Sequence, residues 1–354
     1  NQNNEIELLK KRNELQDAII AEKNAWNFAI VLVLTVVIFV LVVFYRNIRS
    51  KRKANQLLRA KQNEIIIQNQ TLRQQSEEIT SQRDAIEKKN EVLEQRTRQI
   101  ESSIRAAFAI QNALLPHQRK LERLLKDYFI LYRPRDVVSG DFYWIKKIDK
   151  VVYLAVLDCT GHGVPGAFMS LIANTLLDKI LMEKNKYVPS DILLQLHLEV
   201  RKALRPQQNG QDYGLDIGLL QIDKSDRTMY QVTYSGAKRS LYYIKPSDEQ
   251  SAQILETKND RFSIGANYVR TVSFTNHVLD LPKNTQLYLC TDGIADQNNK
   301  KRRTFTSNRL KELLLKNHHL SLSDQKNQID EALDNYMIDT EQRDDMLLLG
   351  MKLS

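Results

Sequence analysis

The segment VVYLAVLDCTGHGVPGAFMS, residues 151–170, joins a strand-like apolar run to a helical pattern through a turn that begins at Asp158. An acidic side chain that closes an apolar strand costs free energy unless its charge is matched. Three further aspartates, Asp141, Asp292 and Asp344, occupy similar strand-end positions elsewhere in the chain. We therefore expect the fold to bring the four carboxylates together in one cation site.

The chemistry of this cluster indicates the kind of cation. Carboxylates without thiolate ligands favour hard ions such as Mg²⁺ or Mn²⁺, and clustered carboxylates repel one another when no ion is present. Zinc is disfavoured because no Cys/His cluster has ligand spacing. Two ions held by shared aspartates can generate a hydroxide near neutral pH and clamp a phosphoryl group. The sequence therefore predicts a metal enzyme that uses Mn²⁺ or Mg²⁺.

Composition and charge narrow the class of protein further. The chain has 354 residues, and its two cysteines, Cys159 and Cys290, exclude a disulfide framework and suit a reduced cytosol. Residues 46–126 hold 18 Lys/Arg and 9 Asp/Glu, so this segment carries an excess equal to the whole net charge of +9. A basic excess beside an apolar span indicates membrane topology and lipid contact. No nucleic-acid reader motif accompanies it, so we expect no nucleic-acid partner.

Residues 25–45, AWNFAIVLVLTVVIFVLVVFY, carry no charge over a length sufficient to cross a bilayer as a helix. A buried core helix is rarely apolar on all sides, and a basic run rather than a cleavage site follows, which disfavours a signal peptide. Six Lys/Arg in residues 46–60 against four in residues 10–24 place the C-terminal side in the cytoplasm. We predict a single pass through the inner membrane, with residues 1–24 as an extracytoplasmic helical segment left from a larger sensor region.

Residues 46–107 form the predicted juxtamembrane and coiled-coil helix. Apolar residues recur every seven positions, as expected of a parallel coiled-coil homodimer: Leu58, Ile65, Leu72, Ile79, Ile86, Leu93 and Ile100. The alternate heptad positions are polar, which weakens pairing and favours rearrangement: Gln62, Asn69, Ser76, Arg83, Asn90 and Thr97. A solvated single helix that only spaces the domain from the membrane is the alternative. Residues 108–127, interrupted by Pro116, form a predicted linker or switch helix.

From residue 128 to residue 354 the sequence has the texture of one globular domain. Strand patterns occupy residues 128–132, 151–157, 215–222, 228–234, 241–244, 286–290 and 346–353. Helical patterns occupy residues 164–184, 189–204, 307–315 and 323–336. Because many strands come in neighbouring pairs and the helices come in blocks, we predict an α+β domain of antiparallel sheets covered by helices.

The motifs in their order resemble the metal-dependent PPM (type 2C) serine/threonine phosphatases, and more narrowly their SpoIIE-like bacterial branch. The resemblance covers residues 105–353 and rests on VVSGDFYW (137–144), DCTGHGVPGAFMS (158–170), TDGIADQ (291–297) and QRDDM (342–346). AIQNALLP (109–116), GLDIGL (214–219) and YSGAKRSLYYI (234–244) also match. It implies a PPM-type β-sandwich of two antiparallel sheets flanked by helices, with the metals at one end.

Carried over by position, the resemblance implies separate roles for the acidic residues. Asp158 would bridge two metals, the backbone carbonyl of Cys159 would join one ion, and Asp141, Asp292 and Asp344 would complete the site. Asp345 is expected to shape the turn rather than to bind metal. Asp212, four residues before Asp216, is a weaker candidate for a third ion.

Two further residues are candidates for catalysis. A phosphate needs a cationic clamp, for which Arg135 is the candidate, with Arg133 or plain surface exposure as alternatives. His162 is the candidate general acid for the leaving alkoxide, although a loop histidine that bonds backbone, or a metal-bound water as acid, would fit as well. The expected substrate is phosphoserine or phosphothreonine on a cytosolic regulatory protein, of which anti-anti-sigma-type proteins are one class. A catalytically idle adaptor that binds a phosphoprotein is the alternative function.

Overall fold

The computed structural model describes residues 2–183, 188–204, 213–226, 228–247, 251–266 and 272–354. It divides the chain into two compact units, Asn1–Gln95 and Arg96–Ser354. The second unit therefore begins inside segment 46–107, which the heptad pattern assigns to the coiled coil.

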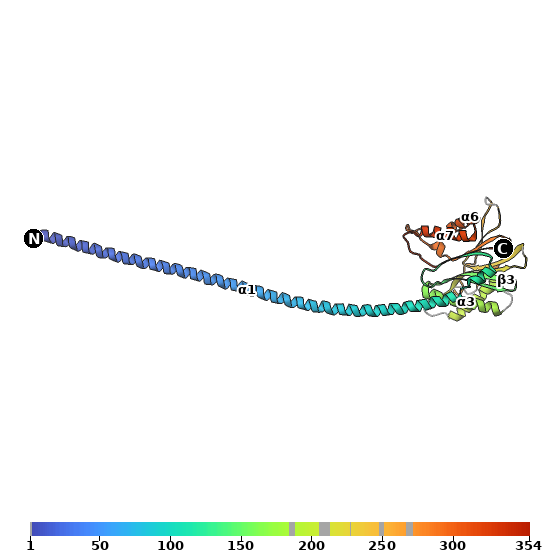
Figure 1. Ribbon diagram of the computed structural model, residues 1–354, viewed down its shortest axis with the longest axis horizontal. Coiled ribbons are helices and arrows are strands. Elements are labelled where there is room, and N and C mark those ends of the chain that lie inside the picture. Colours follow the sequence, from blue (N-terminus) through green and yellow to red (C-terminus); the bar gives the residue numbers. More distant parts are fainter. Residues whose placement is uncertain (1, 184–187, 205–212, 227, 248–250, 267–271) are drawn as a thin grey trace. The chain divides into compact units, whose positions relative to one another are not determined.

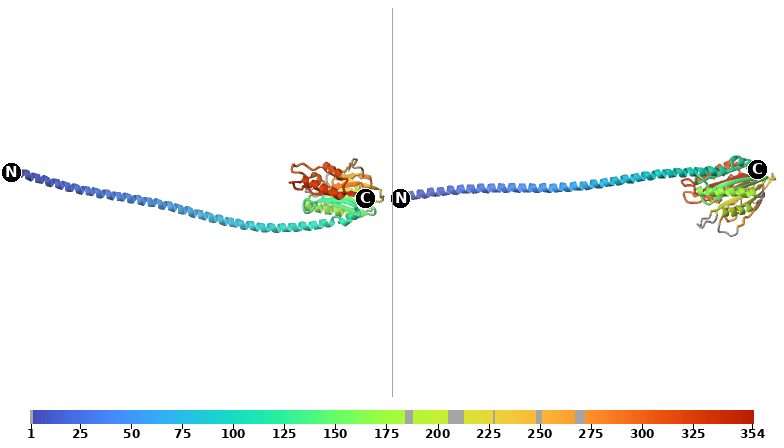
Figure 2. Two further views of the ribbon diagram at one scale, coloured as in Figure 1. Left: turned by 45° about the horizontal axis from the view of Figure 1, so that its top comes forward. Right: turned by 90° about the horizontal axis from the view of Figure 1, so that it is seen from below.

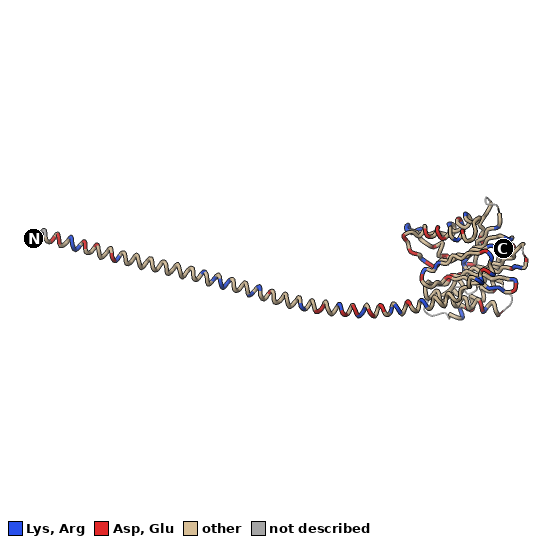
Figure 3. Tube along the Cα trace, in the orientation of Figure 1, with Lys and Arg blue, Asp and Glu red and all other residues tan. Residues whose placement is uncertain are grey.

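Helix α1 (Gln2–Leu114) forms the described part of the first unit and continues into the second. It contains a long apolar stretch, none of which is buried, so α1 holds a candidate membrane span. Figure 3 shows this uncharged stretch between segments that carry charges. The apolar heptad residues between Leu58 and Ile100 are exposed as well. The helix ends two residues before Pro116, because proline disfavours helical backbone in the residue that precedes it.

Two five-stranded antiparallel sheets form the centre of the second unit. The first has the strand order β1-β10-β9-β6-β7 and the second the order β2-β3-β4-β5-β8. The strands of the first sheet are β1 (Asp127–Arg133), β10 (Met346–Lys352), β9 (Gln286–Cys290), β6 (Leu241–Ile244) and β7 (Ile254–Thr257). Those of the second are β2 (Asp141–Ile148), β3 (Val151–Cys159), β4 (Leu215–Asp223), β5 (Met229–Ala237) and β8 (His277–Pro282). The predicted α+β sandwich of antiparallel sheets flanked by helices is confirmed.

The sheets stack face to face, and helices cover both outer faces (Figures 1 and 2). Buried side chains such as Leu154 and Leu349 fill the space between the sheets. Helices α3 (Gly163–Glu183) and α4 (Pro189–Leu204) pack on the second sheet, while α5 (Gly293–Asp296), α6 (Ser307–Asn317) and α7 (Leu322–Tyr336) pack on the first. Successive residues of a strand point to opposite faces of its sheet. Every central strand is therefore buried on both faces, by the other sheet on one side and by helices on the other. Short α2 (Gln118–Leu124) contributes Leu121 to the core between the sheets.

Three strands, β2, β7 and β8, are absent from the sequence prediction. All three lie at sheet edges, where each strand pairs with a single neighbour. Edge strands tolerate charge and proline, and these residues weaken the alternating apolar signal. Lys147 in β2 and Pro282 in β8 are examples. The fourth edge strand, β1, was predicted because its middle residues YFILY carry no charge, so the interrupted apolar pattern rather than edge position alone accounts for the missed strands.

Glycine is required where the loop after β3 returns to the start of β2. A Cβ atom on Gly166 would lie 2.1 Å from the carbonyl oxygen of Gly161 and 2.9 Å from Cα of Gly140. A Cβ atom on Gly140 would lie 2.8 Å from the carbonyl oxygen of Cys159. Because these neighbours are backbone atoms, the close approach cannot be relieved by a side-chain rotation. The two glycines thus set the path of the loop that follows Asp158.

We expect Gly166→Ala to destabilise the second unit by about 1–3 kcal/mol, because overpacking forces backbone to shift. Urea denaturation measures the change. Thr175→Ala, on the exposed face of the same helix, is the control and should stay within about 0.5 kcal/mol of the parent. If Gly166→Ala were as stable as the parent, the close backbone contacts described for Gly166 would be wrong.

Candidate active site

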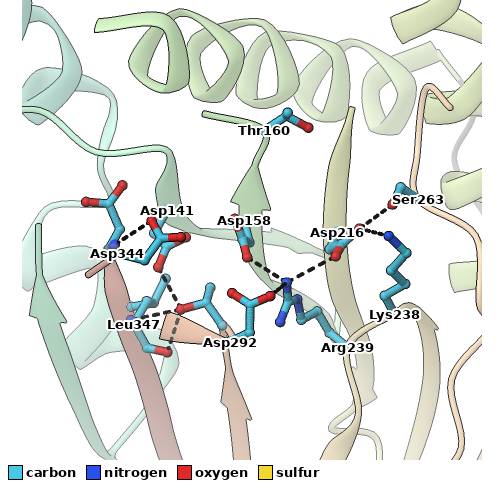
Figure 4. A network of polar contacts seen from close by, with 12 residues as sticks. Asp141, Asp158, Thr160, Asp216, Lys238, Arg239, Ser263, Asp292, Asp344 and Leu347 are labelled. Atoms are coloured by element: carbon cyan, nitrogen blue, oxygen red, sulfur yellow. Dashed lines mark hydrogen bonds and ion pairs between the residues drawn. The ribbon is translucent and has the colours of Figure 1, made fainter. Parts of the chain in front are cut away.

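Aspartates from three adjacent strands lie in one row at the end of the second sheet. Asp141 on β2 pairs in register with Asp158 on β3, and Asp158 pairs with Asp216 on β4. Asp292 follows β9 of the other sheet and precedes α5. Strand register, which joins residues far apart in the sequence, therefore brings these carboxylates to one end of the sandwich (Figure 4).

Asp216 is a site residue that the sequence analysis missed. Its Oδ2 lies 3.0 Å from Nη2 of Arg239, and its Oδ1 accepts a hydrogen bond of 2.6 Å from Ser263 Oγ. Like Asp158, it is an acidic residue beside an apolar run of its strand, within the motif GLDIGL. That pattern was available in the sequence, but only the register pairs it with Asp158.

Arg239 is the second residue that the sequence analysis missed. Its Nη2 lies 2.6 Å from Oδ2 of Asp158 and 2.8 Å from Oδ2 of Asp292, in addition to the contact with Asp216. Burial lowers the pKa of Arg239, but the three carboxylates raise it more strongly, so its pKa is above the ordinary value. The guanidinium is therefore a permanent positive charge among the acidic side chains.

Asp141 is the most deeply buried of the predicted ligands, with 2% of its surface exposed. Its Oδ2 accepts a hydrogen bond of 2.6 Å from Thr291 Oγ1, and its backbone N–H donates to Ser139 Oγ at 3.0 Å. Burial raises the pKa of Asp141 well above its ordinary value. The site thus holds this carboxyl in a set orientation from two sides.

Asp344 and Asp345 are placed differently although they are neighbours. Asp344 lines the pocket beside Asp158 and Asp292, and burial raises its pKa. Asp345 instead accepts 2.7 Å hydrogen bonds from the backbone N–H groups of Arg135 and Gly140. These contacts hold the loop in front of β2, which is the turn-shaping role expected for Asp345.

The two candidate catalytic side chains lie in different surroundings. His162 lines the pocket, and its Nδ1 lies 2.8 Å from Oδ2 of Asp136. Arg135 is not among the pocket-lining residues of the described chain, and its Nη1 donates to the carbonyl oxygen of Arg343 at 3.0 Å. The alternative clamp, Arg133, forms ion pairs with acidic residues of α7. Lys238 and Arg239 are the cationic side chains in the pocket lining.

The donors that surround the pocket fit a hard cation in kind. They are carboxylate oxygens together with the backbone of Cys159, whose carbonyl lies against Gly140. In the described part of the chain, however, no group of three or more Asp, Glu, His or Cys side chains is placed to hold an ion as it stands. The oxygens of Asp158, Asp216 and Asp292 converge on Arg239 instead. Asp212 lies outside the described residues.

The buried carboxyls make the stability of the metal-free protein depend on pH. Burial raises the pKa of Asp141 and of Asp158, so their contribution is fully present below the unfolded pKa of about 4 and is lost as pH rises through the folded pKa. Burial also acts on Asp292, but Arg239 lowers its pKa overall, so its contribution is lost only under more acidic conditions.

We therefore expect the metal-free protein to melt at a higher temperature near pH 5.5 than near pH 8. Each kcal/mol corresponds to about 2–4 °C for a domain of this size. Calorimetry in the presence of a chelator measures the shift. Asp158→Asn should reduce it, whereas a melting temperature that rises with pH over this interval would contradict the assignment.

Comparison with known proteins relates the sequence and fold of this chain to phosphatases. The model of the family described as Stage II sporulation protein E (SpoIIE) matches residues 148–354. The solved SiaA-PP2C domain of Pseudomonas aeruginosa is 31% identical, with a TM-score of 0.64, over 73% of this chain and 98% of that one. The comparison with curated proteins finds no match.

A second solved structure shares the fold at lower identity. It contains the PP2C phosphatase domain and a fragment of the regulatory domain of SpoIIE from Bacillus subtilis. The identity is 17% and the TM-score 0.50, over 64% of this chain and 61% of that one.

Proposed function

Because the chain belongs to the SpoIIE family and is a PPM-type protein phosphatase, we propose that it hydrolyses phosphoserine or phosphothreonine on a cytosolic regulatory protein. The observation that supports this most strongly is the convergence of Asp158, Asp292 and Asp344 from separate elements at one pocket, with Asp141 paired in register beside Asp158. The substrate class, including anti-anti-sigma-type proteins, follows from the family resemblance.

In this proposal the chain holds two Mn²⁺ or Mg²⁺ ions, with a third at Asp212 as an extension. Asp158 would be shared between the ions, and Asp141, Asp292, Asp344 and the carbonyl of Cys159 would complete the set of ligands. Bound ions of this kind supply a hydroxide nucleophile and stabilise charge on the phosphoryl oxygens.

The other pocket residues act on position and protons. Thr291 keeps Asp141 turned toward the site through its 2.6 Å hydrogen bond. Lys238 lines the pocket and is available to a phosphate. Arg135 remains the sequence-based prediction for a clamp. His162, oriented by Asp136, is the proposed proton donor to the leaving alkoxide.

Membrane control is the second part of the proposal. We assign residues 25–45 to an inner-membrane span, the following helix to a parallel homodimer, and the phosphatase domain to the cytoplasm. The coupling of this helix to the site is supported by a contact inside the second unit, where Gln111 near the end of α1 is buried. Its Nε2 donates to the carbonyl oxygen of Ser139 at 2.6 Å and to Ser170 Oγ at 2.9 Å, and its Oε1 accepts from Ser139 N–H at 3.1 Å.

Gln111 thereby connects α1 to the segment that precedes Asp141. Ser139 Oγ in turn accepts the backbone N–H of Asp141. A change in α1 that moves Gln111 would shift the loop that carries this ligand. Control of this kind requires an element that can adopt two arrangements. The heptad segment is suited to this, because its polar layers weaken helix pairing.

The direct test is release of phosphate from a phosphoserine protein by the purified full chain in detergent, with and without Mn²⁺. We expect release that requires the ion and is absent in Asp292→Asn.

One observation, the insertion of Arg239 among the carboxylates, favours the alternative of an idle phosphoprotein-binding adaptor. An adaptor would bind the phosphoprotein without hydrolysis at any Mn²⁺ concentration, and that result would sink the enzymatic proposal.

A further inference from the structure

A cationic side chain of the chain itself, Arg239, lies between two of the proposed metal ligands, Asp158 and Asp292. A single nitrogen, Nη2 of Arg239, contacts Asp158, Asp292 and Asp216 at 2.6, 2.8 and 3.0 Å. The side chain of Arg239 is 10% exposed, so these contacts are largely shielded from water. Figure 4 shows the three carboxylates pointing toward the guanidinium from separate elements. The positive charge of Arg239 thus offsets the mutual repulsion of the three carboxylates.

The backbone that carries Arg239 is fixed on both sides. Lys238, with φ of 56°, is in the left-handed region, and its N–H donates to the carbonyl oxygen of Asp260 at 2.7 Å. The hydroxyl of Tyr234 donates to the carbonyl oxygen of Arg239. Any change in the position of the guanidinium must therefore come from rotation of the side chain rather than from loop movement.

The guanidinium is held mainly by charge. Its Nε is buried and has no hydrogen-bond partner among the described residues. A buried donor without a partner costs free energy, so the arrangement leaves part of the bonding capacity of Arg239 unused. A side chain held in this way is suited to exchange rather than to permanent structural support.

Asp216 gives the guanidinium a contact outside the predicted set of metal ligands. Ser263 Oγ donates to its Oδ1 at 2.6 Å, and Lys238 Nζ lies 3.8 Å from the same oxygen. The orientation of Asp216 is thus maintained without Arg239. Asp216 can therefore keep its contact with Arg239 while Asp158 and Asp292 bind another cation.

We propose that Arg239 is a resident counter-ion, which binds the carboxylates of Asp158 and Asp292 in the metal-free protein and is exchanged there for a divalent cation while Asp216 retains it. This inference rests on the proposed function, because it concerns the same site. Two positive groups cannot share the oxygens of Asp158 and Asp292 at contact distance without strong repulsion. The guanidinium must therefore withdraw before an ion is bound, and the competition weakens the apparent affinity for the ion.

The test is Mn²⁺ binding to the full chain in detergent, measured by titration calorimetry together with the melting temperature. We expect Arg239→Gln to bind Mn²⁺ about tenfold more tightly, since a charged hydrogen-bonding competitor has been removed. The metal-free variant should melt at a lower temperature, so Mn²⁺ should raise its melting temperature by more than that of the parent. Arg309→Gln is the control, because the guanidinium of Arg309 lies over Phe305 and Tyr336. Its Mn²⁺ affinity and the rise in its melting temperature with Mn²⁺ should match those of the parent.

Arg239→Lys covers the case in which the glutamine variant does not fold. Its shorter side chain keeps the charge but loses the fork, so a smaller gain in Mn²⁺ affinity is expected. Unchanged or weaker Mn²⁺ binding in the folded variants, with normal binding in the parent, would overturn the exchange and leave the proposed function intact. Absence of Mn²⁺ binding in the parent and in every variant would instead contradict the proposed function.

Discussion

Asp158→Asn is expected to lower kcat/KM for Mn²⁺-dependent phosphate release by about 10³-fold or more, equivalent to about 4 kcal/mol of transition-state stabilisation. Asp158 is the carboxylate between Asp141 and Asp216 in the row, and it is the proposed bridging ligand. Asparagine keeps the shape of the side chain and removes the charge that two cations would share. Initial rates with a phosphoserine protein, taken at saturating Mn²⁺, measure the effect.

The matched control for this substitution is Asp280→Asn, an exposed aspartate on β8 away from the site. It should keep the parent activity. Melting curves of both variants separate loss of the site from loss of the fold. If Asp158→Asn retained activity within about tenfold of the parent, the bridging assignment would be wrong.

Gln111→Leu is expected to lower both the stability of the second unit and its affinity for Mn²⁺. Leucine fills the space of Gln111 but leaves the N–H and the carbonyl of Ser139 without their partner, at a cost of about 1–3 kcal/mol for each buried group. Ser139 also orients the backbone of Asp141, so the loss reaches a proposed ligand. Removal of groups that orient metal ligands typically costs about 10–100-fold in affinity or activity.

The affinity should be measured by calorimetry well below the melting temperature of the variant, so that partial unfolding does not imitate weak binding. Gln99→Leu, at an exposed position on the same helix, is the control and should bind Mn²⁺ like the parent. An unchanged affinity in Gln111→Leu, despite lower stability, would separate the helix from the site and count against control through α1.

Much of the fold could be predicted from local patterns. Strands such as β3 and β4 are apolar runs closed by polar turns, and helices such as α4 and α7 show one apolar face. The edge strands β2, β7 and β8 were missed because charged residues or proline interrupt their apolar patterns. Of the site, only the acidic residues that occur in recognisable turns at strand ends were predicted.

The remaining part of the site depends on contacts between distant segments. Asp216 joins the site because β4 pairs with β3 in a register that sets it opposite Asp158. Arg135 and Arg239 are alike in sequence terms, since each is an arginine near a strand end. Arg135 bonds the carbonyl oxygen of Arg343, whereas Arg239 reaches three carboxylates. No local pattern distinguishes these two destinations.

The sequence by itself determined an α+β domain of antiparallel sheets covered by helices, the apolar segment of α1, and aspartates at strand ends. Each of these follows from neighbours along the chain, through strand and helix periodicity and the cost of burying charge. The tertiary structure decided that Asp216 stands beside Asp158, that Gln111 holds Ser139, and that Arg239 lies among the carboxylates. The physical reason is that strand register and the reach of long side chains are settled only when the two sheets and their helices pack together.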